Sequence, residues 1–145
     1  MTTSTPRSLH RLRHNVASLE NAETSGSAFL LRRSAESAIL VTNYHLLPPD
    51  PSTEFSITLR NESGKDIAGK NIRVLWFDRL TDFALLAVDL PRHHGLPKGL
   101  VRSGHVAPRI GEEVHAIGNP AHLRQIVTRG IVSGRYHDGD APQLL

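Results

Sequence analysis

Short apolar runs, separated by clusters of turn-forming residues, constrain the fold of this chain more than any other feature of its sequence. Before residue 90, these runs predict strands at 15–20, 27–33, 37–43, 54–60, 67–77 and 83–89. The breaks between them are rich in Gly, Pro, Asn, Asp and Ser, each of which has its own physical reason to favour a turn. Several short strands at this spacing indicate an all-β barrel or sandwich.

The sequence after residue 90 is organised differently. A stretch rich in Pro, Gly and His, from Pro91 to Gly99, is expected to connect two units. Two further strands are expected at 112–118 and 125–135, followed by a polar, turn-like tail from His137 to Pro142. Only the segment from Ser8 to His14 is expected to be helical. The strands are therefore distributed unevenly, with most of them before the connection.

The charge of the chain gives little support for a nucleic-acid partner. Seventeen Lys and Arg residues against fourteen Asp and Glu residues leave a net charge of +3. The basic side chains are spread along the chain, and nucleic-acid surfaces usually cluster them and add aromatic side chains for stacking. The one basic cluster is the amino-terminal arm, with Arg7, His10, Arg11, Arg13 and His14. We expect no nucleic-acid partner and a solvated, frayed arm.

Other features of the composition bear on location. The chain has no apolar run near 18 residues, so no membrane-spanning helix is expected. Its polar start, from Met1 to Pro6, is not followed by the apolar region of a secretory signal. Cysteine is absent from the chain, which excludes a disulfide scaffold, thiol catalysis and cysteine metal sites. Together these features favour a cytoplasmic protein.

One segment approaches a phosphate-binding loop. The sequence GKDIAGKN, from Gly64 to Asn71, is close to the P-loop motif. That motif needs Ser or Thr after the second Lys and a helix opening there, whereas Asn71 occupies the position and strand-like residues follow. We interpret the segment as a surface hairpin without nucleotide.

Nine histidines raise the question of a metal site. His10 and His14 are four residues apart, and His93 and His94 are adjacent. Neither pair has a third ligand at a recognisable spacing. We therefore expect surface histidines, with no metal and no cofactor.

One histidine and one aspartate lie where strands begin and end. The predicted strand 37–43 delivers Thr42-Asn43-Tyr44-His45 at its end, and Asp82 directly precedes the predicted strand 83–89. A catalytic histidine needs an acceptor for its Nδ1–H, which selects the tautomer and stabilises the imidazolium. Strand ends in one barrel could bring Asp82 to His45. On spacing alone, however, a surface or capping role for His45 is the stronger interpretation.

Three segments resemble, in the same order, trypsin-like serine proteases of the HtrA/Deg branch. GSAFLLRR and AILVTNYHLL, within 26–47, resemble the glycine-led strand and the threonine–asparagine–x–histidine strand end of that family. DRLTDFALLAVD, at 78–89, resembles its aspartate segment. IGEEVHAIGNP and IVTRGIVSGR, within 110–135, resemble its G-x-x-V-x-A-I-G-N-P motif and its T-x-G-I-V-S strand.

The resemblance implies an all-β fold built from two six-stranded β-barrels, with the active site in the cleft between them. On this basis residues 1–14 are the basic arm and 15–90 a complete first barrel carrying His45 and Asp82. Residues 91–99 are the connection, and 100–145 hold the first strands of a second barrel. A double barrel commonly needs about 200 residues or more, so we expect the sequence to be the amino-terminal part of a protease.

The resemblance also implies a serine endopeptidase that hydrolyses polypeptides without a cofactor. Carried over by position, His45 is the general base and Asp82 orients it. Asp78 matches an earlier acid of the segment that is not catalytic in the family. Gly118-Asn119-Pro120 is expected to be a structural turn of the second barrel.

The sequence departs from the family at the nucleophile. The family's serine lies in a G-[ND]-S-G-G turn downstream of the GIVS strand, and no G-[ND]-S-G occurs in these 145 residues. Ser133 has Val132 before it instead of Asp or Asn, so it is not expected to be the nucleophile. We therefore predict that the chain alone is inactive. An open sheet edge is expected at 125–135.

Two other functions stay open at this point. The chain could be complete at 145 residues as a non-catalytic, protease-like binding or interaction module, or form half of a barrel pair completed by a second chain or an oligomer. Nucleic-acid binding through the arm is a weaker alternative. It requires salt-dependent affinity that falls when Arg7, Arg11 and Arg13 are removed.

Overall fold

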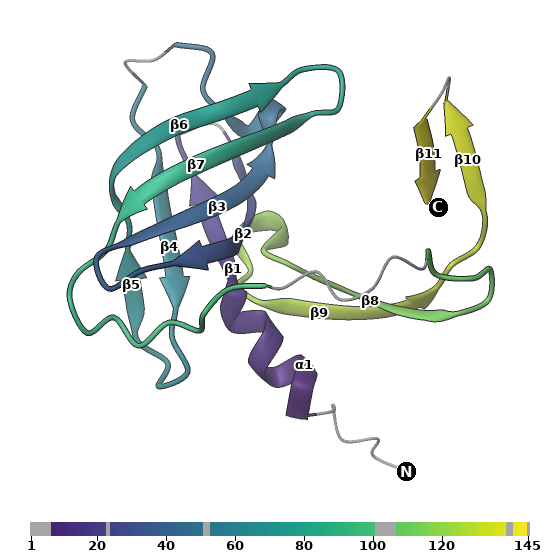
Figure 1. Cartoon of the computed structure of the whole chain (residues 1–145), viewed down its shortest axis with the longest axis horizontal. Helices are drawn as coiled ribbons and strands as arrows, with labels where there is room; N and C mark the ends of the chain where they lie inside the picture. The colour runs from purple at the N-terminus through teal and green to yellow at the C-terminus, as the bar shows by residue number, and fades with distance from the viewer. Residues whose placement is uncertain (1–6, 23, 51–52, 101–106, 139–140, 145) are drawn as a thin grey trace.

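A curled antiparallel sheet dominates the computed structural model, which describes residues 7–22, 24–50, 53–100, 107–138 and 141–144 (Figure 1). The sheet has seven strands in the order β5-β4-β1-β2-β3-β7-β6. These are β1 (Val16–Glu20), β2 (Ser25–Arg33), β3 (Ser37–Asn43), β4 (Ser56–Arg60), β5 (Asp66–Ala68), β6 (Lys70–Asp78) and β7 (Phe83–Asp89). The expected all-β, trypsin-like fold is confirmed.

The inner face of this sheet forms the core. Side chains alternate between the two faces of a strand, so every second residue of β3 and β7 points inward. Burying such apolar side chains contributes roughly 1.5–3 kcal/mol each relative to leaving them exposed. The largest fully buried side chains are Leu19, Leu30, Leu40, Ile57, Leu59, Leu86 and Val88.

Gly69 marks the place where the curled sheet closes on itself. The single strand expected at 67–77 is two strands, because the chain bends at Gly69 between β5 and β6. The backbone N–H of Gly69 donates to the carbonyl oxygen of Ile57 in β4 at 2.8 Å. A Cβ on Gly69 would lie 3.1 Å from the Cβ of Val88 in β7. The two outermost strands of the sheet are therefore consecutive pieces of one bent segment, as glycine allows at a barrel corner.

Two small antiparallel sheets follow. One pairs β8 (Glu113–Gly118) with β9 (Ile126–Ile131), and the other pairs β10 (Arg135–Asp138) with β11 (Ala141–Leu144). The expected turn-like tail was therefore wrong, because a ladder is made by backbone groups and tolerates the polar side chains that suggested a turn. Among the described strands β9 pairs only with β8, so the expected open edge is present.

The amino-terminal arm is helical, as α1 (Arg7–Leu12) and the 3-10 turn η1 (Arg13–Asn15). The expectation of a solvated arm was wrong at His14, which is buried and has Nδ1 3.0 Å from the carbonyl oxygen of Arg60. The reason is that η1 leads directly into β1, so its last residues pack against the sheet. No helix in the described part of the chain is long and apolar enough to cross a membrane.

The segment 91–99 lies against the sheet, and its division from residues 100–145 as separate domains stays a prediction. Leu96 belongs to the core cluster. His94 was expected at the surface but is buried, with Nε2 3.0 Å from the carbonyl oxygen of Ser34. Its Nδ1 accepts the backbone N–H of Leu96 at 3.0 Å. Within the described ranges, no group of three or more His, Asp or Glu could hold a metal ion.

Candidate active site

Pairing of β3 with β7 brings the two predicted site residues together. Asn43, the last residue of β3, lies opposite Phe83, the first residue of β7. The chain continues from β3 into the 3-10 turn η2 (Tyr44–Leu46), which carries His45, while Asp82 immediately precedes β7. Residues one or two positions beyond paired strand ends are neighbours. His45 Nδ1 consequently lies 2.6 Å from Asp82 Oδ2.

Asp82 is held from its backbone as well as its side chain. Its φ of 54° is left-handed, a conformation that costs energy for a residue with a Cβ and is often found at functional sites. Its carbonyl oxygen accepts the backbone N–H of Tyr44 at 3.1 Å and Asn43 Nδ2 at 3.2 Å. Asn43 Nδ2 is also 3.2 Å from the Oδ2 of Asp82. The sequence motif contained Asn43, but its role as a clamp on the aspartate was missed.

Both carboxylate oxygens of Asp82 accept hydrogen bonds from His45. The backbone N–H of His45 donates to Oδ1 at 2.9 Å, and the ring contributes the 2.6 Å contact to Oδ2. These donors, the backbone N–H first and the ring second, lower the pKa of Asp82 below its ordinary value, and Asn43 adds to the effect. Asp82 therefore stays ionised at pH values at which an ordinary aspartate begins to take up a proton.

The contact to an ionised Asp82 defines the state of the His45 ring. A carboxylate can only accept, so Nδ1 carries the proton and Nε2 of the neutral ring keeps its lone pair. Among the described residues, none makes a hydrogen bond to Nε2 of His45, and 66% of this side chain is exposed. The pair can therefore take a proton at Nε2 and stabilise the resulting imidazolium through Asp82.

Asp78, the other aspartate of the segment, has a different task. Its Oδ1 accepts the backbone N–H of Leu80 at 2.9 Å, and its Oδ2 accepts Thr81 Oγ1 at 2.7 Å. The Thr81 hydroxyl and then the Leu80 N–H lower the pKa of Asp78. Asp78 thus caps the turn that leads to Asp82, and in the described part of the chain no hydrogen bond joins it to His45.

An aromatic stack supports η2 from the side of β6. The rings of Tyr44 and Phe77 lie 5.0 Å apart and nearly parallel, and the guanidinium of Arg79 is 5.3 Å from the centre of the Tyr44 ring. Stacked aromatic pairs contribute about 0.5–1.5 kcal/mol beyond the area they bury. The stack was not predicted, since nothing in the spacing of these residues joins position 44 to position 77.

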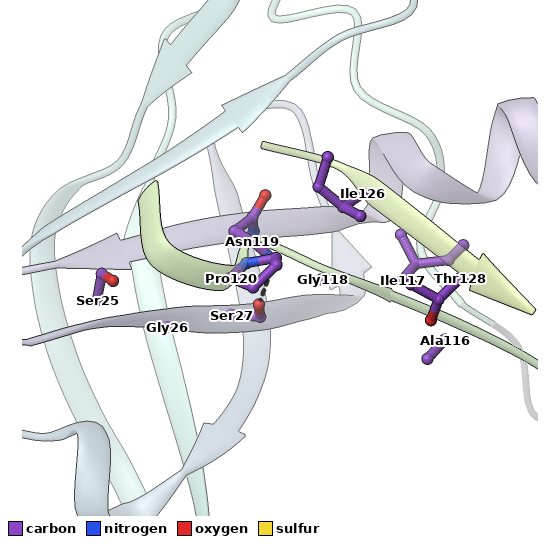
Figure 2. A pocket seen from close by; sticks show the side chains of 10 residues that line it. All are labelled: Ser25, Gly26, Ser27, Ala116, Ile117, Gly118, Asn119, Pro120, Ile126 and Thr128. Carbon is purple, nitrogen blue, oxygen red and sulfur yellow. Dashed lines mark hydrogen bonds between the residues drawn. The ribbon is translucent and has the colours of Figure 1, made fainter. Parts of the chain in front are cut away.

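The expected turn Gly118-Asn119-Pro120 lies between β8 and β9, where Pro120 begins the 3-10 turn η3 (Pro120–His122). Asn119 is buried, its Nδ2 donates to the carbonyl oxygen of Ala17 at 2.7 Å, and its Oδ1 accepts the backbone N–H of Gln125 at 2.7 Å. Its backbone N–H donates to Ser27 Oγ at 2.8 Å. Figure 2 shows this last bond at a pocket of 310 Å³ between β2 and the β8–β9 pair.

A smaller hollow lies beside the histidine–aspartate pair. It has a volume of 180 Å³ and is lined by Asn43, two residues before His45, and by Phe83, directly after Asp82, but by neither residue of the pair. Its other walls are the outer face of the sheet and Ile117 of β8. Ser133 follows β9 and is exposed, and no hydrogen bond joins it to His45 in the described part of the chain. The hollow is mostly apolar and could receive an apolar side chain.

Several known serine proteases resemble this chain in sequence or in structure. Residues 26–144 match the family described as "Trypsin-like peptidase domain". Protease Do-like 1 of Arabidopsis thaliana is 31% identical over 116 residues, covering 80% of this chain and 24% of that protein. Serine protease HTRA1A of Danio rerio is 35% identical over 121 residues, covering 83% of this chain and 22% of that protein.

Two bacterial proteins give the same result. Serine endoprotease DegS of Haemophilus influenzae is 32% identical over 104 residues, covering 70% of this chain and 27% of that protein. The crystal structure of the serine endoprotease from Yersinia pestis superposes with a TM-score of 0.66 at 28% identity. The match covers 92% of this chain and 46% of the solved one. The chain thus spans about a quarter of the length of these curated relatives.

Proposed function

The chain belongs to the trypsin-like peptidase family, with relatives of the HtrA/Deg type, and we propose that it supplies the general base of a serine endopeptidase. The observation that carries the proposal is the 2.6 Å contact between His45 Nδ1 and Asp82 Oδ2, which leaves Nε2 able to accept a proton. The substrate class is a polypeptide.

His45 and Asp82 have separate roles in the proposed reaction. Nε2 of His45 takes the proton of a serine hydroxyl as its oxygen attacks the peptide carbonyl, and later returns a proton to the leaving amine. Asp82 keeps the ring in the tautomer that has Nε2 free and stabilises the imidazolium. The lowered pKa of Asp82 supports this role because the carboxylate stays charged while the ring changes its charge.

The attacking serine and the oxyanion-binding N–H groups do not come from a G-[ND]-S-G turn within the 145 residues. Acyl transfer therefore requires residues from outside this sequence. The exposed side chain of His45 and the apolar hollow lined by Asn43 and Phe83 are compatible with a further segment approaching there. A cytoplasmic location stays part of the proposal and rests on the composition alone.

The function is tested by supplying the missing turn. The serine-bearing segment of the Haemophilus influenzae relative is joined after Leu145, and labelling by a fluorophosphonate and hydrolysis of unfolded casein are measured. We expect labelling that is lost in His45→Ala, whereas the 145-residue chain alone is not labelled. Labelling of the fusion that is unchanged in His45→Ala would show that this histidine is not the base.

The second candidate is a protease-like binding module without catalysis. It is supported by the exposure of the pair, since a surface histidine bonded to an aspartate can be purely structural. The fusion separates the two candidates. A fusion that folds, as shown by its circular dichroism, but neither labels nor hydrolyses casein favours the binding module.

A further inference from the structure

The side chains of the turn η2, which carries His45, lie in three different environments. Tyr44 stacks on Phe77 of β6, and the His45 side chain is largely exposed. Leu46 is half-buried and packs against the core of the sheet. The ladder between β3 and β7 ends at Asn43, so strand pairing no longer holds the chain around His45. The position of the ring therefore depends on the contacts that its neighbours in the turn make.

Leu46 lies directly on the backbone of β2 at Gly26. A Cβ built on Gly26 would overlap Leu46 Cδ1 and would lie 2.8 Å from Cδ2. It would also lie 3.1 Å from Cγ, the branch point of the leucine side chain. Rotation about the Cβ–Cγ bond moves the two methyl groups but leaves Cγ in place. A side chain at position 26 would therefore have to displace the whole side chain of Leu46.

The space that Leu46 fills belongs to the inner face of the sheet. Gly26 pairs with Leu19 of β1, and Ala28, two residues further along β2, pairs with Ala17. These three partners and neighbours are all buried, and alternate residues of a strand share a face, so a side chain at position 26 would also point inward. Leu46 thus takes the place of the side chain that Gly26 lacks. The φ of Gly26 is not left-handed, so the position needs glycine for its small size.

Strand β2 is fixed next to this contact, because Ser27, the residue after Gly26, is held from two sides. Its Oγ accepts the backbone N–H of Asn119 at 2.8 Å (Figure 2), and its carbonyl oxygen accepts the hydroxyl of Thr42 at 2.8 Å. Thr42 lies three residues before His45, so β2 also holds the strand that leads into η2. Pairing with β1 holds Gly26 itself. A side chain at position 26 would therefore be accommodated by movement of η2 and not of β2.

We propose that Gly26 is a positioning residue for His45, because Leu46 packs on its bare backbone and this contact fixes the position of η2 relative to β7. The catalytic consequence rests on the proposed function, in which Nδ1 of His45 stays bonded to Asp82. The two atoms are 2.6 Å apart, so a movement of η2 by about 1 Å away from Asp82 would break this hydrogen bond. A misplacement of about 1 Å can lower the rate of an enzyme about 10²-fold.

The proposal is tested on the 145-residue chain by the nitrogen NMR signals of the His45 ring. Which ring nitrogen carries the proton depends on the hydrogen bonds of the ring, and histidine rings are neutral above about pH 8. At such a pH, we expect Nδ1 to carry the proton in wild type. In Gly26→Ala, the His45 signals, identified by their loss in His45→Ala, should shift toward a mixture of the two tautomers. Gly130→Ala is the matched control and should give wild-type signals, since no heavy atom lies within 4 Å of its added Cβ.

Shortening Leu46 should reverse the effect of a side chain at position 26. In the double variant Gly26→Ala with Leu46→Ala, the methyl group at position 26 enters the space that Leu46 filled, so the ring signals should return toward those of wild type. If Gly26→Ala does not fold, as judged by circular dichroism, folding of the double variant supports the same contact, and failure of both variants to fold overturns the proposal.

Two further outcomes separate this proposal from the proposed function. Wild-type ring signals in Gly26→Ala, or a shift that Leu46→Ala does not reduce, would overturn the role of Gly26 and leave the histidine–aspartate pair intact. A wild-type chain in which Nδ1 of His45 carries no proton would overturn both.

Discussion

Asn119, between β8 and β9, donates a hydrogen bond of 2.7 Å from Nδ2 to the carbonyl oxygen of Ala17 in β1. These residues are far apart in the sequence, and the bond lies in the buried interior. This bond attaches the turn of the β8–β9 pair to the large sheet, and the bond from Gln125 N–H to Oδ1 of Asn119 holds the turn itself together. Asn119 is thus one of several attachments between this pair and the sheet, beside the bonds from its own N–H to Ser27 Oγ and from Arg124 to Asp66.

Replacing Asn119 by Ala should destabilise the folded chain. It removes the buried hydrogen bond to the carbonyl oxygen of Ala17 and the partly buried one from the N–H of Gln125, and a buried polar group that loses its partner costs about 1–3 kcal/mol. We expect a loss of roughly 2–4 kcal/mol in the free energy of unfolding, measured in urea. Ser133→Ala, at an exposed position, serves as the control and should change it by less than about 0.5 kcal/mol.

Gly69→Ala should also destabilise the chain, for a steric reason. The new Cβ would lie 3.1 Å from the Cβ of Val88, a fully buried residue that has little room to move. Overpacking of this kind typically costs about 1–3 kcal/mol. Gly130→Ala is the matched control, because no heavy atom lies within 4 Å of its added Cβ. Equal stability of the two variants in thermal unfolding would contradict the closure at Gly69.

The contacts of Asp82 predict a specific dependence of stability on pH. The folded-state pKa of Asp82 is lowered, so its contribution to stability is fully present above the unfolded value, about 3.9. The contribution falls as the pH drops through the folded pKa, because the folded state then binds the proton. The stability difference between wild type and Asp82→Asn should therefore be constant near neutral pH and shrink below about pH 4.

This difference is measured by urea unfolding at several pH values, with the carboxyl carbon of Asp82 followed by NMR. Asp78→Asn is an internal comparison, since the pKa of Asp78 is also lowered but by Thr81 and Leu80 instead of His45. If the difference in stability between wild type and Asp82→Asn grew as the pH fell below 4, the prediction would be contradicted.

Replacing the two aspartates, Asp82 and Asp78, should lower the rate of catalysis by very different factors. In the fusion carrying the serine turn, Asp82→Asn should lower kcat by about 10³–10⁴-fold, because the ring then loses the partner that selects its tautomer. Asp78→Asn should lower it by less than about tenfold, since Asp78 touches the turn and not His45. Hydrolysis of a chromogenic peptide measures both. Similar losses in the two variants would mean that the turn, and not Asp82, determines the activity.

Much of the fold could be predicted because it depends on local patterns. The strands expected at 27–33, 37–43 and 83–89 are close to β2, β3 and β7 as observed. Their alternating or β-branched composition and flanking turn residues are properties of adjacent positions. The split at Gly69 was missed, because it depends on the approach of β4 and β7 rather than on its neighbours in the chain.

The same distinction applies to His14 and His94. Both were expected at the surface because no third metal ligand lies at a recognisable spacing, but packing of η1 and of the segment 91–99 against the sheet buries both. Each has a ring nitrogen close to a backbone carbonyl oxygen of a distant residue. Hydrogen-bond partners so far away in the chain cannot be predicted from the spacing of residues in the sequence.

For the candidate site, the order of residues in the chain is enough to identify the participants, a histidine after one strand and an aspartate before another. Their geometry comes from the folded sheet: the β3–β7 register, the left-handed backbone of Asp82 and the donors from Asn43 and His45. The physical reason is that strand propensity and turn chemistry act between neighbouring residues. Register, burial and hydrogen bonding between distant positions depend on how the whole sheet closes.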